Sequence, residues 1–333
     1  MNRRRWSLAC IAGLIPTPFH LSAAMPTLLQ TPPLQPRPLD PARRISKVRY
    51  ASRMSGPTLV GLGAPADGQW PLWALTPQAG AQPLLRLSSP YGGPGFDLAG
   101  STAGPAAVWS RPGSAISPLW TRVADQPPVE LSALQPMGVY QGPRLVRGAT
   151  AAGVTAVTEV DAQTRLALLL RRDTPQRILP AIGSGRLLAG QLVNHGARRW
   201  LFALCLPPGA RLPERLDLLG ESLSAGVLHA VPLDDSWGPA GPVQQPFGDD
   251  RLYEFDVDVV GPALVAIATS SQGWRWARGA DVGGAGAWQA APEAAVAEAP
   301  LTSPAVLADG AAVRIALLQA ADGGASRLLL AQV

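Results

Sequence analysis

Hydrophobic residues in this chain come in short bursts and not in long amphipathic runs. From residue 43 onward, bursts of four to eight apolar residues alternate with turns rich in Gly, Pro and Asp. A candidate helix at residues 291–300 is short and contains Pro292 and Pro300 near its ends. Short apolar runs bounded by turn residues are typical of β-strands. The pattern therefore predicts an all-β fold.

A recurring phrase divides these strands into units. Gly-Pro or Ser-Pro followed by an apolar burst begins at Gly56, Gly104, Gly142, Gly261 and Ser303. Two variants begin at residues 189 and 225, so that seven starting points follow one another about every 41 residues. A period of 40–45 residues with about four strands per unit is typical of a β-propeller. We predict about seven four-stranded blades, with six blades and one long insertion as the alternative.

The two ends of the chain suggest how such a ring would close. The last unit has only three clear bursts, whereas residues 43–54 form a burst without a unit of its own. We expect this segment to join the last blade and so remove an exposed sheet edge. Residues 25–42 are rich in proline, which fixes φ and lacks an N–H donor, so they are predicted to be a linker without helix or strand. The propeller domain is predicted to span residues 43–333.

The N-terminus has the features of a secretory signal peptide. Three arginines at positions 3–5 precede an apolar stretch, and the small residues at 22–24 fit a cleavage site. We predict a signal peptide over residues 1–24 and a periplasmic or extracellular protein. Lipid attachment at Cys10 is less favoured, because Ser7 stands where Leu is expected. No later segment has the roughly 20 continuous apolar residues that span a bilayer.

The charge distribution argues against a nucleic-acid partner. The chain has a net charge of +5, but residues 1–53 alone have +8, which leaves −3 for the remainder. Binding to phosphates requires a basic surface that releases counterions. An acidic body behind a basic leader does not provide one, so we expect no binding to nucleic acid. We also expect the protein to be a monomer.

An acidic row is the most suggestive polar feature of the sequence. Glu254, Asp256 and Asp258 alternate with apolar residues in a predicted strand and therefore share one face, about 6.5–7 Å apart. Such a row could bind a cation or act in acid–base chemistry. The favoured interpretation is a solvent-facing outer strand whose charges discourage edge pairing, with no metal and no cofactor. Under that interpretation Asp256→Asn changes stability by no more than about 0.5 kcal/mol.

A second candidate site is aromatic. In Trp274-Arg275-Trp276, alternation places both indoles on one face of a strand that follows a turn. Exposed tryptophans with a neighbouring arginine suit contacts with a protein or a sugar. We therefore consider these three residues a candidate binding platform.

Two family resemblances follow from particular segments. The stretch "SPAVLADGAAVRIALLQAADGGASRLLLAQV" at 303–333 resembles the repeats of TolB-like β-propellers, with "LWALTPQAGAQPLLRLS" and "LFALCLPPGARLPERL" as partial copies. It departs from that pattern because Asp309-Gly310 lies five residues after Pro304. The stretch "TSSQGWRW" at 269–276 resembles the Asp-box of sialidase-type propellers, with Ser271 at the usual Asp position. Such boxes are turns that stabilise blades and are not catalytic sites.

These resemblances imply two functions. The favoured one is a binding or scaffolding module without catalysis, with an unidentified protein or glycan as partner. The alternative is a glycan-active propeller enzyme, either a sialidase-like hydrolase or a lyase. A sialidase needs a Tyr–Glu pair, but Tyr253 and Glu254 are adjacent in a predicted strand and so point to opposite faces.

Overall fold

A computed structural model gives the fold of the chain. It describes residues 29–51, 54, 56–76, 80–88, 95–101, 104–110, 119–130, 144–147, 155–161, 166–171, 174–179, 182, 186–208, 214–216, 222–279, 288–295, 300–320 and 326–333. The predicted signal peptide at 1–24 lies outside these residues.

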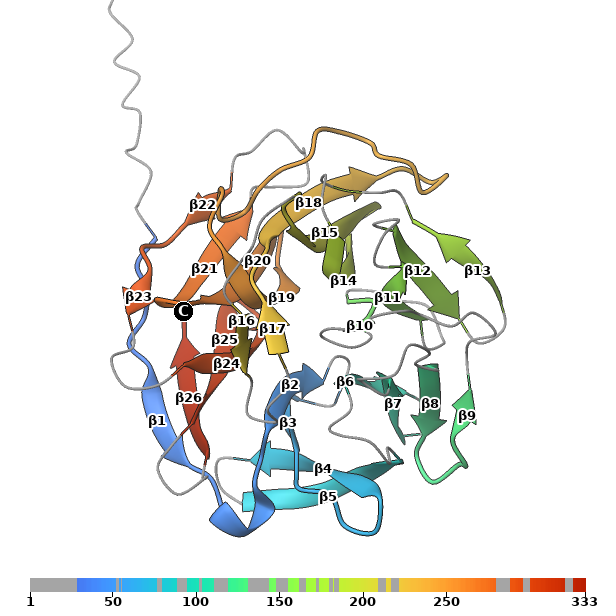
Figure 1. Ribbon diagram of the computed structural model, residues 1–333, viewed down its shortest axis with the longest axis vertical. Helices are drawn as coiled ribbons and strands as arrows, with labels where there is room; N and C mark the ends of the chain where they lie inside the picture. Colours follow the sequence, from blue (N-terminus) through green and yellow to red (C-terminus); the bar gives the residue numbers. More distant parts are fainter. Residues whose placement is uncertain are drawn as a thin grey trace, which may run out of the picture.

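The described chain is built almost entirely of antiparallel sheets arranged around a centre (Figure 1). The first sheet contains β2 (Lys47–Ala51), β3 (Thr58–Leu62), β4 (Gln69–Thr76) and β5 (Gly80–Ser88). The next contains β6 (Gly95–Ser101), β7 (Gly104–Ser110), β8 (Leu119–Val123) and β9 (Val129–Glu130). It is followed by β10 (Arg144–Leu145), β11 (Thr155–Asp161), β12 (Leu166–Arg171) and β13 (Thr174–Ile178).

The second half of the ring is less regular. A three-stranded sheet contains β14 (Arg186–His195), β15 (Arg198–Leu206) and β18 (Val227–Leu233), and a separate hairpin contains β16 (Glu214–Leu216) and β17 (Ser222–Ser224). The next sheet contains β19 (Leu252–Val260), β20 (Ala263–Ser270), β21 (Gly273–Gly279), β22 (Gln289–Ala290) and β23 (Ala294–Ala295). The last contains β24 (Leu301–Asp309), β25 (Ala312–Ala320), β26 (Ser326–Gln332) and β1 (Gln35–Pro38).

Local sequence explains the tight turns between strands. Between β3 and β4, Ala66 and Gln69 form an antiparallel bridge around the two-residue loop Asp67-Gly68. Both loop residues have positive φ, 52° and 71°, as a type I′ hairpin turn requires. Asp and Gly tolerate that conformation better than other residues do, so the turn joins the two strands without strain.

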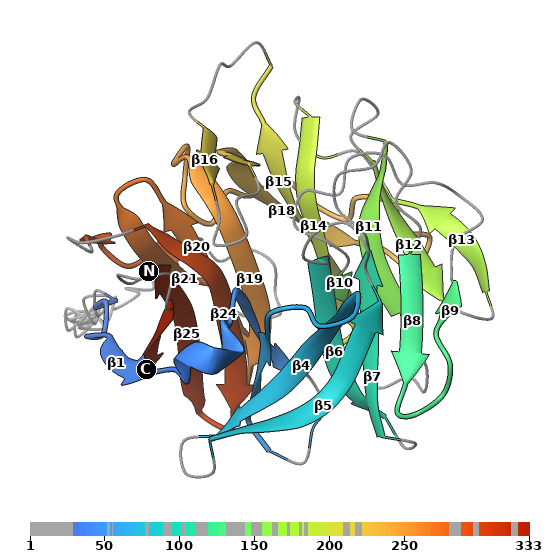
Figure 2. The same cartoon turned by 60° about the horizontal axis from the view of Figure 1, so that its bottom comes forward.

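The first strands of the sheets form a closed inner circle. Neighbouring contacts run from β2 to β6, β10, β14, β19 and β24, and β24 contacts β2 again. Figure 2 shows β14 and β19 standing steeply in the ring, and Figure 1 shows later strands such as β5, β9, β13 and β22 at its outside. The sheets pack face to face through hydrophobic clusters; one of them joins Ile267 and Trp274 to Val306 and Ile315 of the next sheet. The all-β propeller prediction is therefore confirmed.

Ring closure differs from the expectation in one respect. Lys47–Ala51 does not join the last sheet; β2 pairs with β3 and begins the first sheet. The strand that joins the last sheet is β1, whose residues Gln35–Pro38 pair with Arg327–Leu330 of β26. This strand lies inside residues 25–42, the proline-rich segment that was predicted to contain no strand. It can form there because an outermost strand tolerates residues that donate no ladder hydrogen bond.

The recurring Gly-Pro phrase does not mark equivalent positions in the sheets. The phrases at Gly104 and Gly261 precede or begin the second strand of a sheet, whereas the phrase at Ser303 lies inside the first strand, β24. The phrase at residue 225 leads into β18, which pairs with β15 and begins no new sheet. The phrase therefore occurs either just before a strand or within one, and it does not count blades.

Helical structure is almost absent from the described ranges, where the one helix is the 3-10 turn η1 (Pro41–Arg43). That part of the chain therefore contains no helix that is long and apolar enough to cross a membrane.

Candidate functional site

A cluster of buried polar residues occupies the inner strands, and we call it the charged hub. Its members are each less than 9% exposed: Arg49, Asp97, Arg144, Arg147, Gln191, Glu254, Asp256 and Asp258. They come from β2, β6, the segment around β10, β14 and β19. Strands β10 and β19 are not neighbours in the ring, yet the Arg144 guanidinium donates to the carbonyl oxygen of Phe255 at 2.9 Å. The cluster therefore bridges the middle of the propeller.

Asp256 has the largest number of partners in the hub. Its Oδ2 accepts the backbone N–H of Val306 at 2.9 Å, and its Oδ1 accepts from Gln191 Nε2 at 3.1 Å. The guanidinium nitrogens of Arg144 and Arg147 lie 3.6 Å from the same carboxylate. One fully buried carboxylate thus connects the four inner strands β10, β14, β19 and β24 and the segment after β10.

The acidic row joins two neighbouring sheets through backbone amides. Glu254 accepts the N–H of Ser303 at 2.7 Å, and Asp258 accepts the N–H of Ala308 at 2.9 Å, on either side of the Asp256–Val306 bond. The carboxylates follow one another every two residues, whereas the first two amides are three residues apart. A β-bulge between Thr302 and Ala305 accounts for this difference. The row therefore satisfies donors at the edge of β24 that would otherwise be unpaired.

A second acid ties together β6 and the segment around β10. Asp97 accepts the backbone N–H of Leu98 at 2.8 Å and that of Leu145 at 2.9 Å. Its carboxylate lies 3.9 Å from Arg147 Nη2. The backbone of Arg147 is itself fixed on β14, because its N–H donates to Leu192 and its carbonyl accepts from Asn194.

The charges in the hub shift one another's pKa values. Burial by itself would raise the pKa of Asp256, but Arg147, Arg144 and Arg49 outweigh it and hold that pKa below the ordinary value. Burial also works to lower the pKa of Arg147, yet Asp256 and Asp97 outweigh it and raise that pKa. The arginine and the aspartate are therefore both charged at neutral pH.

Two hub residues show the cost of burial directly. Burial, together with repulsion from Arg144, lowers the pKa of Arg49 to about 10. Burial raises the pKa of Asp258 above the ordinary value, although Arg147 opposes the shift. The environment of Asp258 is therefore less favourable to a negative charge than that of Asp256.

The structure corrects the interpretation of the acidic row. Glu254, Asp256 and Asp258 do share one face of a strand, but that strand is the innermost of its sheet and is buried, so it is not a solvent-facing outer strand. Each carboxylate binds a different backbone amide, and no cluster of three His, Cys, Asp or Glu side chains that could hold a metal ion exists among the described residues. The row joins two sheets and does not converge on one ion.

The tryptophan platform is also corrected. Trp274 is 0% exposed and Trp276 is 2% exposed, and both pack in the cluster between the last two sheets. The Trp276 indole donates to the carbonyl of Gln30 at 3.0 Å, and Arg275 Nε donates to the carbonyl of Ala291. Because β21 is covered by its neighbours, neither indole offers a face to a partner.

The segment that resembles an Asp-box lies at a turn between two strands, which is where Asp-boxes are found. Residues 269–276 contain the β20–β21 turn, where the Ser270 hydroxyl accepts the backbone N–H groups of Gln272 and Gly273 at 3.0 and 3.2 Å. A serine one position before Ser271 thus fixes the turn.

No prediction from the sequence covered Arg144, Arg147 and Asp97, which complete the charged hub. Arg144 and Arg147 stand in the phrase "GPRLVRG", and Asp97 stands in "GFDLAG". The one sign of such a cluster in the sequence is a charged residue inside an apolar burst. Such a residue is expected to be buried, and a buried charge needs a partner of opposite charge. The sequence does not show which opposite charge that partner is.

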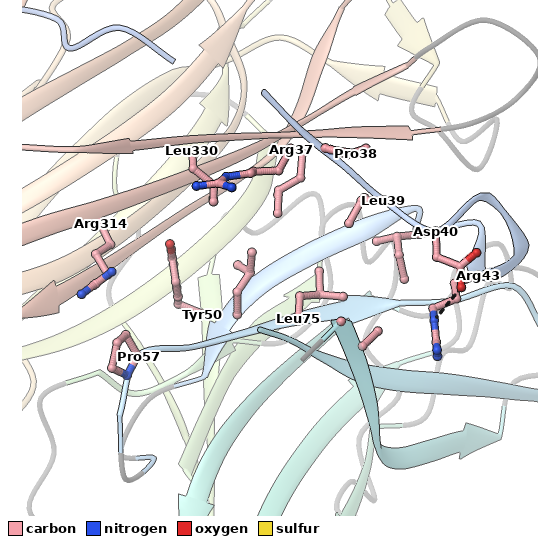
Figure 3. Close-up of a pocket in the computed structure, with 15 residues that line it drawn as sticks. Arg37, Pro38, Leu39, Asp40, Arg43, Tyr50, Pro57, Leu75, Arg314 and Leu330 are labelled. Atoms are coloured by element: carbon pink, nitrogen blue, oxygen red, sulfur yellow. Dashed lines mark hydrogen bonds and ion pairs between the residues drawn. The ribbon is translucent and has the colours of Figure 1, made fainter. Parts of the chain in front are cut away.

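A pocket lies where the first and last sheets meet, and we call it the junction pocket (Figure 3). It has a volume of about 340 Å³, and its walls come from β1, the η1 turn, β2 to β5, β25 and β26. Apolar residues such as Leu59, Leu75 and Leu330 alternate with Arg37, Arg314 and other polar residues. Burial raises the pKa of Tyr50, which lines this pocket, to about 12.

The closed ring of antiparallel sheets defines the chain as an all-β propeller, and comparisons with solved structures agree with this class. A mutant of the Aleuria aurantia lectin in complex with Fucalpha1-6GlcNAc has a TM-score of 0.57 at 9% identity, covering 86% of this chain and 93% of the lectin. A neuraminidase-like protein of A/little yellow-shouldered bat has a TM-score of 0.51 at 7% identity, covering 90% and 98%.

Beyond these structures, no protein-family model and no curated protein matches the chain. Identities below a quarter relate these propellers by fold alone. The TolB-like resemblance therefore stays a prediction from the sequence.

Proposed function

We propose that this chain is a secreted or periplasmic propeller that binds a protein or a glycan and catalyses no reaction. One observation favours binding over catalysis: the carboxylates of the charged hub are occupied by buried arginines and backbone amides. A glycosidase needs two carboxyl groups that flank the sugar, one of them protonated and both accessible. Asp256 is 0% exposed with a lowered pKa, and Asp97 is also 0% exposed.

The strongest argument for an enzyme comes from Asp258. Its raised pKa suits a general acid, and two positions along a strand are about 6.5–7 Å apart, within the range for an inverting pair. The second group of that pair would be Asp256, which is held by two arginines and shielded from water. It could not activate a water molecule, so the binding proposal is favoured.

The order of the sheets supports six blades for this binding module, with the β16–β17 hairpin as the insertion. The inner circle passes through β2, β6, β10, β14, β19 and β24 before it closes. The β16–β17 hairpin pairs with no other sheet among the described strands. This arrangement is the alternative considered from the sequence.

Activity and binding measurements test the proposal together. The purified protein should release no product from chromogenic glycosides, including sialosides and fucosides, and should be screened on a glycan array for retained ligands. Asp258→Asn serves as the control variant, because it keeps an oxygen acceptor for the Ala308 amide. Turnover by the wild type that is lost in a folded Asp258→Asn variant would establish the enzyme instead.

The localisation has its own test. Expressed in a Gram-negative host, the protein should be recovered from the periplasm with a mass that begins at Met25. Ala24→Arg should leave the leader attached, because a large charged residue does not suit the cleavage site. Cytoplasmic protein that retains Met1 would rule out the envelope assignment.

A further inference from the structure

We propose that the junction pocket binds a small organic anion with an apolar body, its acidic group held by Arg37 and the Tyr50 hydroxyl. The inference goes beyond the proposed function, because it assigns a small-molecule site between the first and last sheets, lined by none of the charged-hub residues. The outcome of the glycan experiments therefore does not decide whether this proposal is correct.

Tyr50 provides the first argument. Its side chain is only 5% exposed, and none of the hydrogen bonds between described residues involves its hydroxyl. Figure 3 shows the hydroxyl pointing into the pocket, toward the guanidinium of Arg37. The hydroxyl oxygen is not among the fully buried atoms without a partner, so it is accessible from the pocket and can donate a hydrogen bond to a ligand there. Since its pKa is about 12, the hydroxyl stays protonated at neutral pH and can donate to an anion.

The charges around the pocket favour an anion. The lining contains Arg37, Arg43 and Arg314 against the single acid Asp40. Arg43 is occupied, because it pairs with Asp40 at 3.1 Å and stacks over the Trp73 ring at 4.1 Å.

The two remaining arginines differ in their partners. Arg314 is held by Asp309 at 2.7 Å. Arg37 has no ion pair or hydrogen bond from its side chain within the described residues. Arg37 on β1 and Tyr50 on β2 thus both line the junction pocket, and neither polar group has a hydrogen-bond partner within the described residues.

Pocket size and lining define the rest of the ligand. A volume of about 340 Å³ lies at the small end of ligand pockets, which is too small for a folded partner or a long chain. Ile45, Leu59, Leu75, Leu328 and Leu330 provide apolar walls beside the polar groups. A carboxylate, sulfate or sulfonate attached to an aromatic or aliphatic body fits this combination.

A pair of matched dyes tests the proposal on the whole protein. The anionic probe is 8-anilinonaphthalene-1-sulfonate, and its neutral counterpart without the sulfonate is N-phenyl-1-naphthylamine. We expect the anionic dye to bind at one site per chain, and the neutral dye to bind at least about tenfold more weakly, since charged hydrogen bonds contribute that much.

Variants locate the site. Tyr50→Phe keeps the aromatic ring and removes only the hydroxyl, and Arg37→Gln changes an exposed residue of β1. Both variants should therefore fold. Each should weaken binding of the anionic dye at least about tenfold. Arg199→Gln is the control, because it makes the same replacement of an arginine by glutamine on β15, away from the pocket, where Arg199 lies over the Trp237 ring. It should bind the dye like the wild type. Equal binding of both dyes, wild-type binding by either pocket variant, or an equal loss in Arg199→Gln would overturn the proposal.

Discussion

Replacing Asp256 by alanine is expected to lower the free energy of unfolding by about 3–5 kcal/mol, the range for breaking a buried ion pair. The substitution removes the acceptor for the Val306 amide and for Gln191, and it leaves Arg144 and Arg147 buried without this counter-charge. Urea denaturation at pH 7 measures the change. A loss of this size would contradict the solvent-facing interpretation, which predicts almost no change in stability when Asp256 is replaced by asparagine.

The control for this prediction is an aspartate in an exposed ion pair. Asp235→Ala breaks a 3.4 Å pair with Arg199, but the Asp235 side chain is fully exposed, so we expect a change within about 0.5 kcal/mol. A similarly small effect of Asp256→Ala would show that the hub adds no stability.

The pH dependence of the Asp256 effect follows from its lowered pKa. A carboxylate with a lowered pKa stabilises the fold fully above the pKa of the unfolded chain, and it loses that contribution as the pH falls through the folded value. The difference between wild type and Asp256→Ala should therefore shrink only below the ordinary aspartate value of 3.8. Asp258 should act in the opposite direction, because its pKa is raised and its contribution declines as the pH rises.

Removing the N-terminal strand is expected to have the second largest effect. Deletion of residues 1–40 should lower the free energy of unfolding by about 2–4 kcal/mol, because it uncovers the edge of β26 and the apolar contacts of Leu29 and Leu34. It also removes the carbonyl of Gln30, which accepts from the Trp276 indole. Thermal or urea unfolding of the purified truncation gives the measurement.

Deletion of residues 1–28 is the matched truncation, because it keeps β1, the apolar contacts of Leu29 and Leu34, and the carbonyl of Gln30. It should leave stability unchanged within about 0.5 kcal/mol. If both truncations were equally stable, ring closure would depend on the contact between β2 and β24 and not on β1.

Strand formation was predictable from the sequence because it depends on local chemistry. Bursts such as "ALVAIATS" alternate with Gly, Pro and Asp turns, and the structure places this one in β20, buried at all eight positions. The Asp67-Gly68 turn is equally local, since its positive φ values suit those two residues. The sharing of one face by Glu254, Asp256 and Asp258 also follows from the two-residue period of a strand.

The partners of these strands were not predictable, because they depend on residues far apart in the chain. Alternation places the three acids on one face but gives no sign that their partners are amides 49 or 50 residues later, offset by a bulge between Thr302 and Ala305. Trp274 and Trp276 share a face as expected, but the neighbouring sheet covers that face. Whether a strand face meets water or another sheet is decided by packing.

The sequence by itself determined the all-β fold, the turn positions and the spacing of the acidic row, since each follows from side chains close together in the chain. Tertiary structure alone decided which strand closes the ring, which arginines neutralise Asp256, and that Arg37 and Tyr50 line one pocket. Proline allows β1 only as an outermost strand, and a buried carboxylate requires buried cations. Both requirements are met by segments that become neighbours only when the ring closes.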